Sequence, residues 1–339
     1  MHAESPVSTA IDASDLPATH GAYGAKSNDK EEAYGRKKRR SLPELIGMGF
    51  ELVPWNGVDP RPIVDMHGRI VAVLAGQPRD PTYAADAAAA FAAMQAEAAD
   101  ACFPSSMSKH RRGLFPAINA GLYYGKGTRM ACRLDNGKKH NAIADRLLDN
   151  PAFKRLASFA DASFALWAPL IYRLYQQHDR SLRKRFPHLR RNFVGSVFSC
   201  AAFNFGPNVW TFKHRDDQNL GFGWCAVQAV GPFDPTKGGH LVLWDLKLVV
   251  EFPPGATILL PSATVAHSNL PVQAGDKRAS FTQYTPGGLI RFVDNGFRTE
   301  KDLAAQDPEE YERMRELKAS RWERGIGLFS TIDTLLEPL

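Results

Sequence analysis

Two histidines and one aspartate in the second half of the chain have the spacing of a metal site. His214 and Asp216 are two residues apart, so their side chains point to the same side of an extended segment. His267 follows about fifty residues later, after another apolar run. Two histidines and a carboxylate on one side of a metal leave the opposite side open for a co-substrate and oxygen, as in non-haem iron oxygenases. We therefore predict that these three residues, called the metal triad below, hold a catalytic iron(II).

An arginine downstream of the metal triad is a candidate for binding an organic co-substrate. Arg278 lies eleven residues after His267, at the start of the next apolar run, and Ser280 points the same way. A guanidinium can bind a carboxylate through two parallel hydrogen bonds. We predict that Arg278 and Ser280 bind the distal carboxylate of 2-oxoglutarate, whose keto-acid end chelates the iron, and that Asn204 contacts the other carboxylate. The expected co-substrates are therefore 2-oxoglutarate and O2.

Each of these features has an ordinary alternative when it is taken singly. A histidine two residues before an aspartate is frequent by chance, and a histidine near a strand end is usually a hydrogen-bonded core or surface residue. The three residues of the metal triad and Arg278 all lie in one β-rich segment and in the required order. That combination is much rarer by chance, which favours the iron and 2-oxoglutarate interpretation.

Short apolar runs separated by Gly and Pro predict the scaffold that positions these groups. Regular short strands with turn residues between them are typical of closed or double-sheeted β structures. We expect a double-stranded β-helix, or jelly roll, over residues 193–298. The predicted strands are 193–198, 224–230, 240–244, 248–252, 257–260 and 279–284.

The flanking regions indicate helices, so the expected fold class is α+β. Residues 43–192 are predicted to be mostly helical, with a β-hairpin at 63–74 and a helix at 83–101. A long helix is expected to begin at the N-cap Asn150 and to kink at Pro169. Charged residues at helical spacing within 299–339 predict a C-terminal helix outside the β core.

The bulk composition favours a soluble, intracellular protein. Of the 339 residues, 44% are hydrophobic, and no run approaches the roughly 20 apolar residues of a membrane helix. Without such a run, we expect no membrane partner. The four cysteines lack the spacing of a zinc site, so we expect free thiols. A formal charge of +6 and a pI near 9.1 fit a polyanionic partner.

Residues 1–42 are predicted to form a disordered basic tail. They lack apolar periodicity and contain five consecutive cations, Arg-Lys-Lys-Arg-Arg, at 36–40. Such a run is typical of a nuclear import signal or of an arm that binds DNA, although a solvated tail is the simpler alternative. We expect a nuclear protein.

Several blocks of the sequence resemble the TET/JBP family, in particular its fungal, transposon-associated branch. The resemblance runs from about residue 43 to 298 and is densest after residue 192. The blocks that carry it are NFVGSVF (192–198), FNFGP (203–207), HRDDQN (214–219), GWCA (223–226), DPTKGGHLVLWD (234–245) and FTQY (281–284).

This resemblance implies a double-stranded β-helix enzyme that oxidises the methyl group of a modified DNA base. It implies that Asn219 hydrogen-bonds the flipped base and that Tyr284 stacks on it. Where the animal members use a histidine for the base this chain has Pro286, and it lacks their cysteine-rich zinc module. We expect 5-methylcytosine as the main substrate, oxidised to 5-hydroxymethylcytosine and beyond, with N6-methyladenine as a second substrate.

Basic residues outside the predicted strands are candidates for holding DNA phosphates. The alternatives are a solvated basic surface, a protein or small-molecule hydroxylase of the same superfamily, and a non-catalytic DNA-binding relative. The candidate cations form two stretches, Lys126, Arg129, Arg133, Lys138 and Lys139, and Arg180, Arg183, Lys184, Arg185, Arg190 and Arg191.

Overall fold

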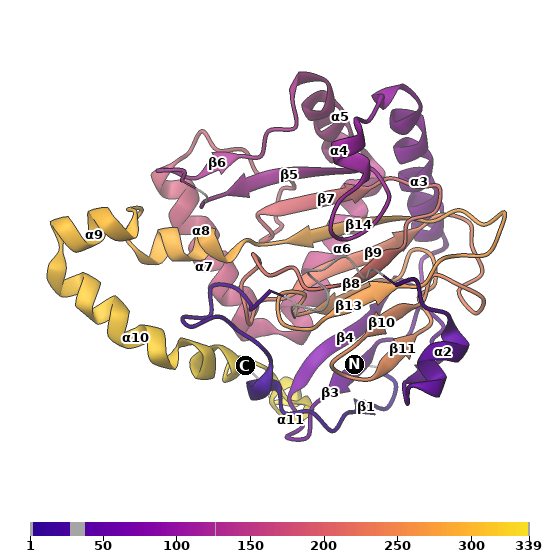
Figure 1. Cartoon of the computed structure of the whole chain (residues 1–339), viewed down its shortest axis with the longest axis horizontal. Coiled ribbons are helices and arrows are strands. Elements are labelled where there is room, and N and C mark those ends of the chain that lie inside the picture. Colours follow the sequence, from indigo (N-terminus) through magenta and orange to yellow (C-terminus); the bar gives the residue numbers. More distant parts are fainter. Residues whose placement is uncertain (1–2, 28–37, 126, 338–339) are drawn as a thin grey trace.

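Two facing β-sheets form the centre of the molecule in the computed structural model, which describes residues 3–27, 38–125 and 127–337 (Figure 1). The strands within each sheet are antiparallel except for the edge pairs β1–β3 and β2–β11. The predicted double-stranded β-helix and the α+β class are confirmed. The larger sheet has the order β1 (Val7–Ser8), β3 (Arg61–Val64), β4 (Ile70–Gly76), β12 (Thr257–Leu260), β9 (Cys225–Val230), β14 (Ala279–Tyr284), β7 (Cys200–Asn204), β5 (Ala117–Tyr123), β6 (Cys132–Arg133). The smaller sheet has the order β2 (Glu51–Val53), β11 (Leu248–Val250), β10 (Leu241–Leu243), β13 (His267–Asn269), β8 (Thr211–His214).

Side-chain alternation gives the larger sheet one apolar outer face and one more polar inner face. Phe203 on β7 and Phe281 on β14 pack outward into a core with Phe153. Their neighbours Ser280, Thr282 and Tyr284 therefore point inward, toward the smaller sheet. Helices α3 (Pro81–Ala101), α5 (Lys138–Asp149) and α6 (Pro151–Trp167) cover the outer face.

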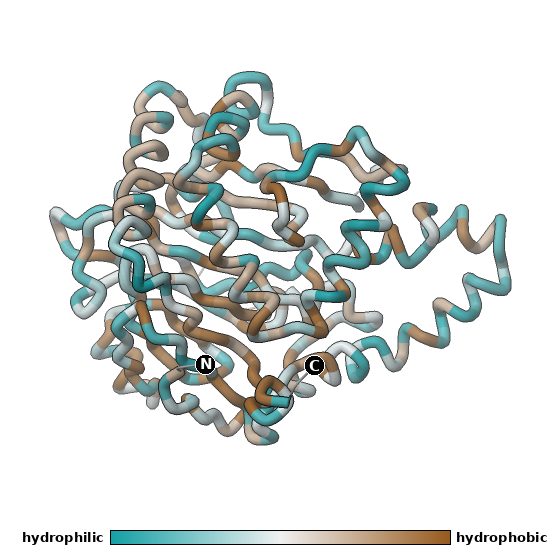
Figure 2. The backbone as a smooth tube through the Cα atoms, turned by 180° about the vertical axis from the view of Figure 1, so that it is seen from behind, coloured by the Kyte–Doolittle hydropathy of each residue, from teal (hydrophilic) through white to brown (hydrophobic). Residues whose placement is uncertain are grey.

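The smaller sheet is covered on its outer side by a short helix. Leu45 of α2 (Leu42–Gly47) packs with Val242 and Val249, and Ser41 caps this helix. The inner side of the same sheet presents Leu243 beside the metal-triad residue His267. Figure 2 shows the hydrophobic segments concentrated along the strands, as expected for two sheets that share a core.

Helices at the carboxyl end form an arm beside the sheets. After β14 the chain runs through α8 (Gly287–Asp294), which contacts α7 (Pro169–Arg185). It then turns outward through α9 (Glu300–Gln306) and returns along α10 (Pro308–Ile326) (Figure 1). The predicted single C-terminal helix is divided at Asp307, which caps α10, and a last helix, α11 (Ile332–Leu336), follows.

The N-terminal segment is part of the fold, so the predicted disorder of residues 1–42 is wrong for residues 3–27. Strand β1 pairs with β3 in the register Val7–Ile63, a 3-10 helix follows at Ala13–Asp15, and Ala13 and Ala22 are fully buried. Small buried side chains, rather than a periodic apolar pattern, anchor this segment. Arg36 and Lys37 of the cationic run lie outside the described residues.

Three boundaries also differ from the sequence prediction. Residues 193–198 form turns rather than a strand, because Asp161 accepts a hydrogen bond from Val197 N while Val194 is exposed. Region 43–192 has the predicted helices and the predicted hairpin β3–β4, but it also supplies the unpredicted strand β5 to the larger sheet. The expected kinked helix is two helices, α6 and α7, because Ala168 before Pro169 leaves the helical conformation.

The cysteine prediction is confirmed, since Cys102, Cys132, Cys200 and Cys225 are all free thiols. Within the described residues, no helix combines the length and the apolar character needed to cross a membrane.

Candidate active site

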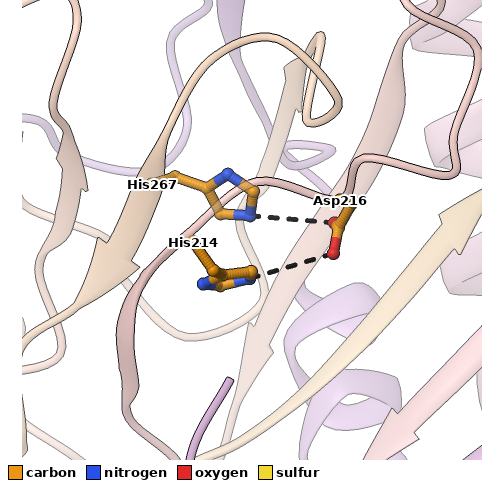
Figure 3. A group of neighbouring side chains, drawn as sticks. All are labelled: His214, Asp216 and His267. Atoms are coloured by element: carbon orange, nitrogen blue, oxygen red, sulfur yellow. Dashed lines mark ion pairs between the residues drawn. The ribbon is translucent and has the colours of Figure 1, made fainter. Parts of the chain in front are cut away.

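The metal triad assembles where two neighbouring strands of the smaller sheet meet. His214 ends β8, His267 begins β13, and these two residues are paired directly across the ladder. Asp216 follows β8 and turns its carboxylate toward both imidazoles (Figure 3). Its oxygens lie 3.9 Å from His214 Nε2 and 3.8 Å from His267 Nε2, and one potential ligand atom from each residue lies within 4.8 Å of the others. The structure therefore brings the three predicted residues together as a possible metal site.

Backbone carbonyls hold both imidazoles in the form that binds a metal. His214 Nδ1 donates to Phe212 O at 2.8 Å, and His267 Nδ1 donates to Val265 O at 2.9 Å. With Nδ1 protonated, each Nε2 has its lone pair free on the side of Asp216. Two histidines and one carboxylate on one side of a metal are the ligand set of non-haem iron(II) enzymes, so the residues fit iron(II).

Burial and charge set the protonation states that metal binding requires. Burial lowers the pKa of both His214 and His267, most strongly that of His214, so both are neutral at pH 7. Burial alone would raise the pKa of Asp216, but the two imidazoles and the nearby Arg112 and Arg111 outweigh it and lower this pKa. Neutral imidazoles and an ionised carboxylate are the forms that coordinate a metal.

Arg278 is a buried cation with unused hydrogen-bonding capacity. Its side chain is fully buried, between the rings of Phe233 and Phe252. Nη1 donates to Val209 O at 2.9 Å, whereas Nε and Nη2 have no hydrogen-bond partner. Burial lowers the pKa of Arg278 to about 10, so the guanidinium stays charged at neutral pH. Two unpaired donors on a buried charge fit the carboxylate of a small dicarboxylic acid.

Ser280 and Asn204 lie together on the same inner face as Arg278. They are paired across β14 and β7, and Asn204 Nδ2 donates to Ser280 Oγ at 3.0 Å. Asn204 Oδ1 is buried without a partner. The structure thus brings Asn204 to the Ser280 side of the site, while its contact with the second carboxylate of 2-oxoglutarate stays a prediction.

His240 is a further polar residue next to this site that sequence reasoning missed. Both of its ring nitrogens are buried without partners, and burial lowers its pKa to about 4. The preceding Gly239 lies against the Arg278 side chain, because a Cβ there would approach Arg278 Cδ to 3.2 Å. The Gly238–Gly239 pair directly before His240 was the available signal in the sequence.

A cleft of about 950 Å3 leads from the metal triad to the surface along the inner face of the larger sheet. Asp216, Asn219 and Tyr284 all line it. Asn219 Nδ2 donates to Ser262 Oγ at 3.0 Å, and the Tyr284 hydroxyl donates to Asn119 Oδ1 at 3.3 Å. The two residues expected to contact a base therefore line the same cleft as Asp216 of the metal triad.

Three further cleft residues were missing from the sequence prediction: Asn119, Arg111 and Arg112. Arg111 forms an ion pair with Asp217 at 3.1 Å, and Asp217 also lines the cleft. The adjacent pair Arg111–Arg112 was the available signal, but the turn that presents it cannot be located from the sequence alone.

Four of the eleven cations proposed to hold DNA form ion pairs within the described part of the protein. Arg183 and Arg191 both bind the buried carboxylate of Asp179, and Arg190 binds Asp149 at 2.8 Å. These three arginines therefore form ion pairs around α7, and their contact with DNA stays a prediction. In the first stretch, Arg133 lines the cleft but is paired with Asp145, and Lys126 lies outside the described residues.

The chain was compared with family models, curated proteins and solved structures. No protein-family model matches the sequence, and no curated protein matches it. Among solved structures, the chain is similar to NgTET1 in complex with 5mC DNA, with 12% identity and a TM-score of 0.46 over 74% of this chain and 92% of that chain. It is similar to a 2OG-Fe(II) oxygenase family oxidoreductase from Burkholderia pseudomallei, with 16% identity and a TM-score of 0.31 over 57% and 77% of the two chains.

A third similar structure is the viral collagen prolyl hydroxylase of Paramecium bursaria Chlorella virus 1 in complex with 2OG. The identity is 16% and the TM-score 0.21, over 32% of this chain and 67% of that chain. Scores this low do not carry the chemistry over, which therefore rests on the geometry of the site. The ligand set of the metal triad and the two unpaired donors of Arg278 fit iron(II) and a dicarboxylate co-substrate.

Proposed function

We propose that this protein is an iron(II)- and 2-oxoglutarate-dependent dioxygenase that oxidises the methyl group of a modified DNA base. The observation that carries the proposal is the buried Arg278, whose Nε and Nη2 lack hydrogen-bond partners. Arg278 lies next to β14 of the larger sheet, and the metal triad, which can hold a metal, lies on the facing smaller sheet. An unpaired buried charge costs several kcal/mol unless a ligand completes it. A carboxylate that bridges from Arg278 toward the triad would remove that cost.

Each residue has one task in this proposal. The metal triad holds iron(II), and Arg278 with Ser280 holds the distal carboxylate of 2-oxoglutarate. Bound together, these groups and oxygen supply oxidation of a C–H bond with release of succinate and carbon dioxide. The backbone bonds to the two imidazole Nδ1 atoms keep both rings oriented, so the triad is preorganised before any ligand binds.

The cleft supports a nucleobase as the substrate. An extruded base costs a few kcal/mol, and stacking on an aromatic ring such as Tyr284 returns roughly 1–3 kcal/mol. Because Asn219 Nδ2 is engaged by Ser262, its Oδ1 is left to accept from an exocyclic amino group. Both 5-methylcytosine and N6-methyladenine present such a donor.

We infer that 5-methylcytosine is the main substrate, oxidised to 5-hydroxymethylcytosine and further forms, and that N6-methyladenine is the second. The resemblance to fungal members of the TET/JBP family supports this order. Pro286, which also lines the cleft, supplies no side-chain donor that would favour cytosine. This residue leaves a purine as an acceptable alternative.

The decisive experiment is mass spectrometry of nucleosides from methylated DNA after incubation with enzyme, iron(II) and 2-oxoglutarate. We expect 5-methylcytosine to be consumed and succinate to form in proportion. Succinate formation that DNA does not stimulate would favour a protein or small-molecule hydroxylase. DNA binding without any succinate would favour a non-catalytic relative.

A nuclear location is part of the same proposal. It rests on the cationic run at 36–40, of which Lys38 and Arg40 form ion pairs with Glu44. A fluorescent fusion should accumulate in nuclei, and replacing all five cations by Gln should abolish the accumulation. Unchanged nuclear accumulation of the replaced form would refute the role of this run.

A further inference from the structure

We infer that a groove beneath α10 binds the phosphodiester backbone of duplex DNA on one side of the target base. This inference rests on the proposed function and adds a binding surface outside the cleft. The groove lies between α8, the α9–α10 arm and the N-terminal segment around Tyr23 (Figure 1). Its lining includes Arg291 of α8 and Lys318 of α10.

The groove and the active-site cleft are continuous. Thr19, Tyr23 and Arg291 line both of them. A strand whose target base enters the cleft can therefore continue into the groove without leaving the protein surface. Arg291 occupies the junction near Tyr23 and Tyr124: burial raises the pKa of both hydroxyls, and the charge of Arg291 opposes that rise.

The groove contains cations that the fold does not use. Among the described residues, no hydrogen-bond or ion-pair partner is found for the side chains of Arg291 and Lys318. Their neighbours are committed, since Arg315 binds Glu312 and Arg321 donates to Gly21 O while lying over the Tyr23 ring. The groove has one acidic lining residue, Glu300. Positive charge without internal partners fits a polyanion.

The shape of the arm favours an extended partner. Helix α10 spans 19 residues, yet only Gly325 and Ile326 near its end are buried among them. The helix is attached to the body at that end, where Arg321 and Trp322 donate to carbonyls of the N-terminal segment. A helix held at one end and polar along most of its length (Figure 2) is an exposed wall rather than a core element.

Together these features indicate a sugar–phosphate backbone instead of a small anion. The two free cations come from separate helices along an open path, whereas a small-anion site would gather its donors around one point. Tyr23 adds an aromatic side chain to the lining of the same groove, as is common where proteins follow nucleic-acid strands. Contacts of this kind position the duplex and carry no sequence information.

The test is the salt dependence of DNA binding, measured with fluorescently labelled duplexes in EDTA so that chemistry plays no part. Each of Arg291→Gln and Lys318→Gln should reduce the slope of log affinity against log salt by about 1, and the double variant by about 2. The reduction should be the same for methylated and unmethylated duplexes. Arg291→Lys should restore the slope, which separates loss of charge from damage to α8.

Lys154→Gln is the control, because it removes one surface positive charge from α6, on the opposite face of the larger sheet. Its slope should equal that of the wild type. Equal slopes for the groove variants and the wild type, or no duplex binding by the wild type, would overturn the inference. If wild-type enzyme oxidises the base while the groove variants keep the full slope, the groove fails and the proposed function stands. If the slopes fall but no methyl group is oxidised, the groove stands and the proposed function fails.

Discussion

Replacing Arg278 by Met should make the ligand-free protein more stable while removing its response to 2-oxoglutarate. Burial lowers the pKa of Arg278 to about 10, and a drop of this size from the usual range of arginine corresponds to about 3 kcal/mol against the charged form. The single hydrogen bond to Val209 O returns about 1 kcal/mol. Met has a similar volume and no charge, so Arg278→Met should raise the free energy of unfolding by about 2 kcal/mol.

The order of stabilities should reverse when the co-substrate is present. At a 2-oxoglutarate concentration 100 times its Kd, the wild type should gain about 2.7 kcal/mol. Arg278→Met lacks the donors for the distal carboxylate and should gain almost nothing. Urea unfolding followed by tryptophan fluorescence, with Mn(II) in place of iron and with or without 2-oxoglutarate, measures both effects.

Arg155→Met provides a control for this experiment. Arg155 lies on α6 and forms ion pairs with Asp80 and Asp86 at the surface, so its loss should change stability by less than about 1 kcal/mol. The full response to 2-oxoglutarate should remain. An undiminished 2-oxoglutarate response in Arg278→Met would refute the anchoring role. A less stable ligand-free Arg278→Met would show that the guanidinium is already satisfied in the free protein.

Three further sets of substitutions test the triad, the base contacts and the fold. Alanine at any position of the metal triad should abolish iron retention and turnover, and iron content after gel filtration near the wild-type level would refute the assignment. Asn219→Ala should slow methyl oxidation, and Tyr284→Ala should weaken duplex binding by about 1–3 kcal/mol, with iron and 2-oxoglutarate binding intact in both; unchanged kinetics and affinity would remove their base-contact roles. Burial lowers the pKa of His178, but its 2.8 Å contact with Asp294 outweighs burial and raises this pKa above 6.5. That contribution is complete below pH 6.5 and is lost as pH rises through the folded-state pKa, so His178→Gln should destabilise the protein more at pH 6 than at pH 9; equal losses in urea unfolding would contradict this.

The structure also changes which electrostatic experiment is informative. Neutralising Arg183 or Arg191 would break their ion pairs with the buried Asp179 and would report on folding. Arg291 and Lys318 are better positions, since their side chains lack such partners within the described part of the chain. The sequence showed the same residue types in both places, and only the packing of Asp179 separates them.

The sequence by itself determined the chemistry-bearing residues. Ligand type and two-residue spacing selected His214 and Asp216, and a strand signal placed Ser280 on the same face as Arg278. These inferences were possible because alternation along a strand is a local property that a few neighbouring residues specify. The strands at 257–260 and 279–284 were located for the same reason.

Tertiary structure decided everything that depends on which distant segments meet. It recruited β1 from a segment without apolar periodicity, where Val7 pairs with Ile63, and it brought Asn119 from β5 into the cleft. It also left Arg278 buried with two unpaired donors. Local sequence patterns specify the side to which a residue points, but the partner opposite it is fixed by sheet register and by burial of residues far apart in the chain.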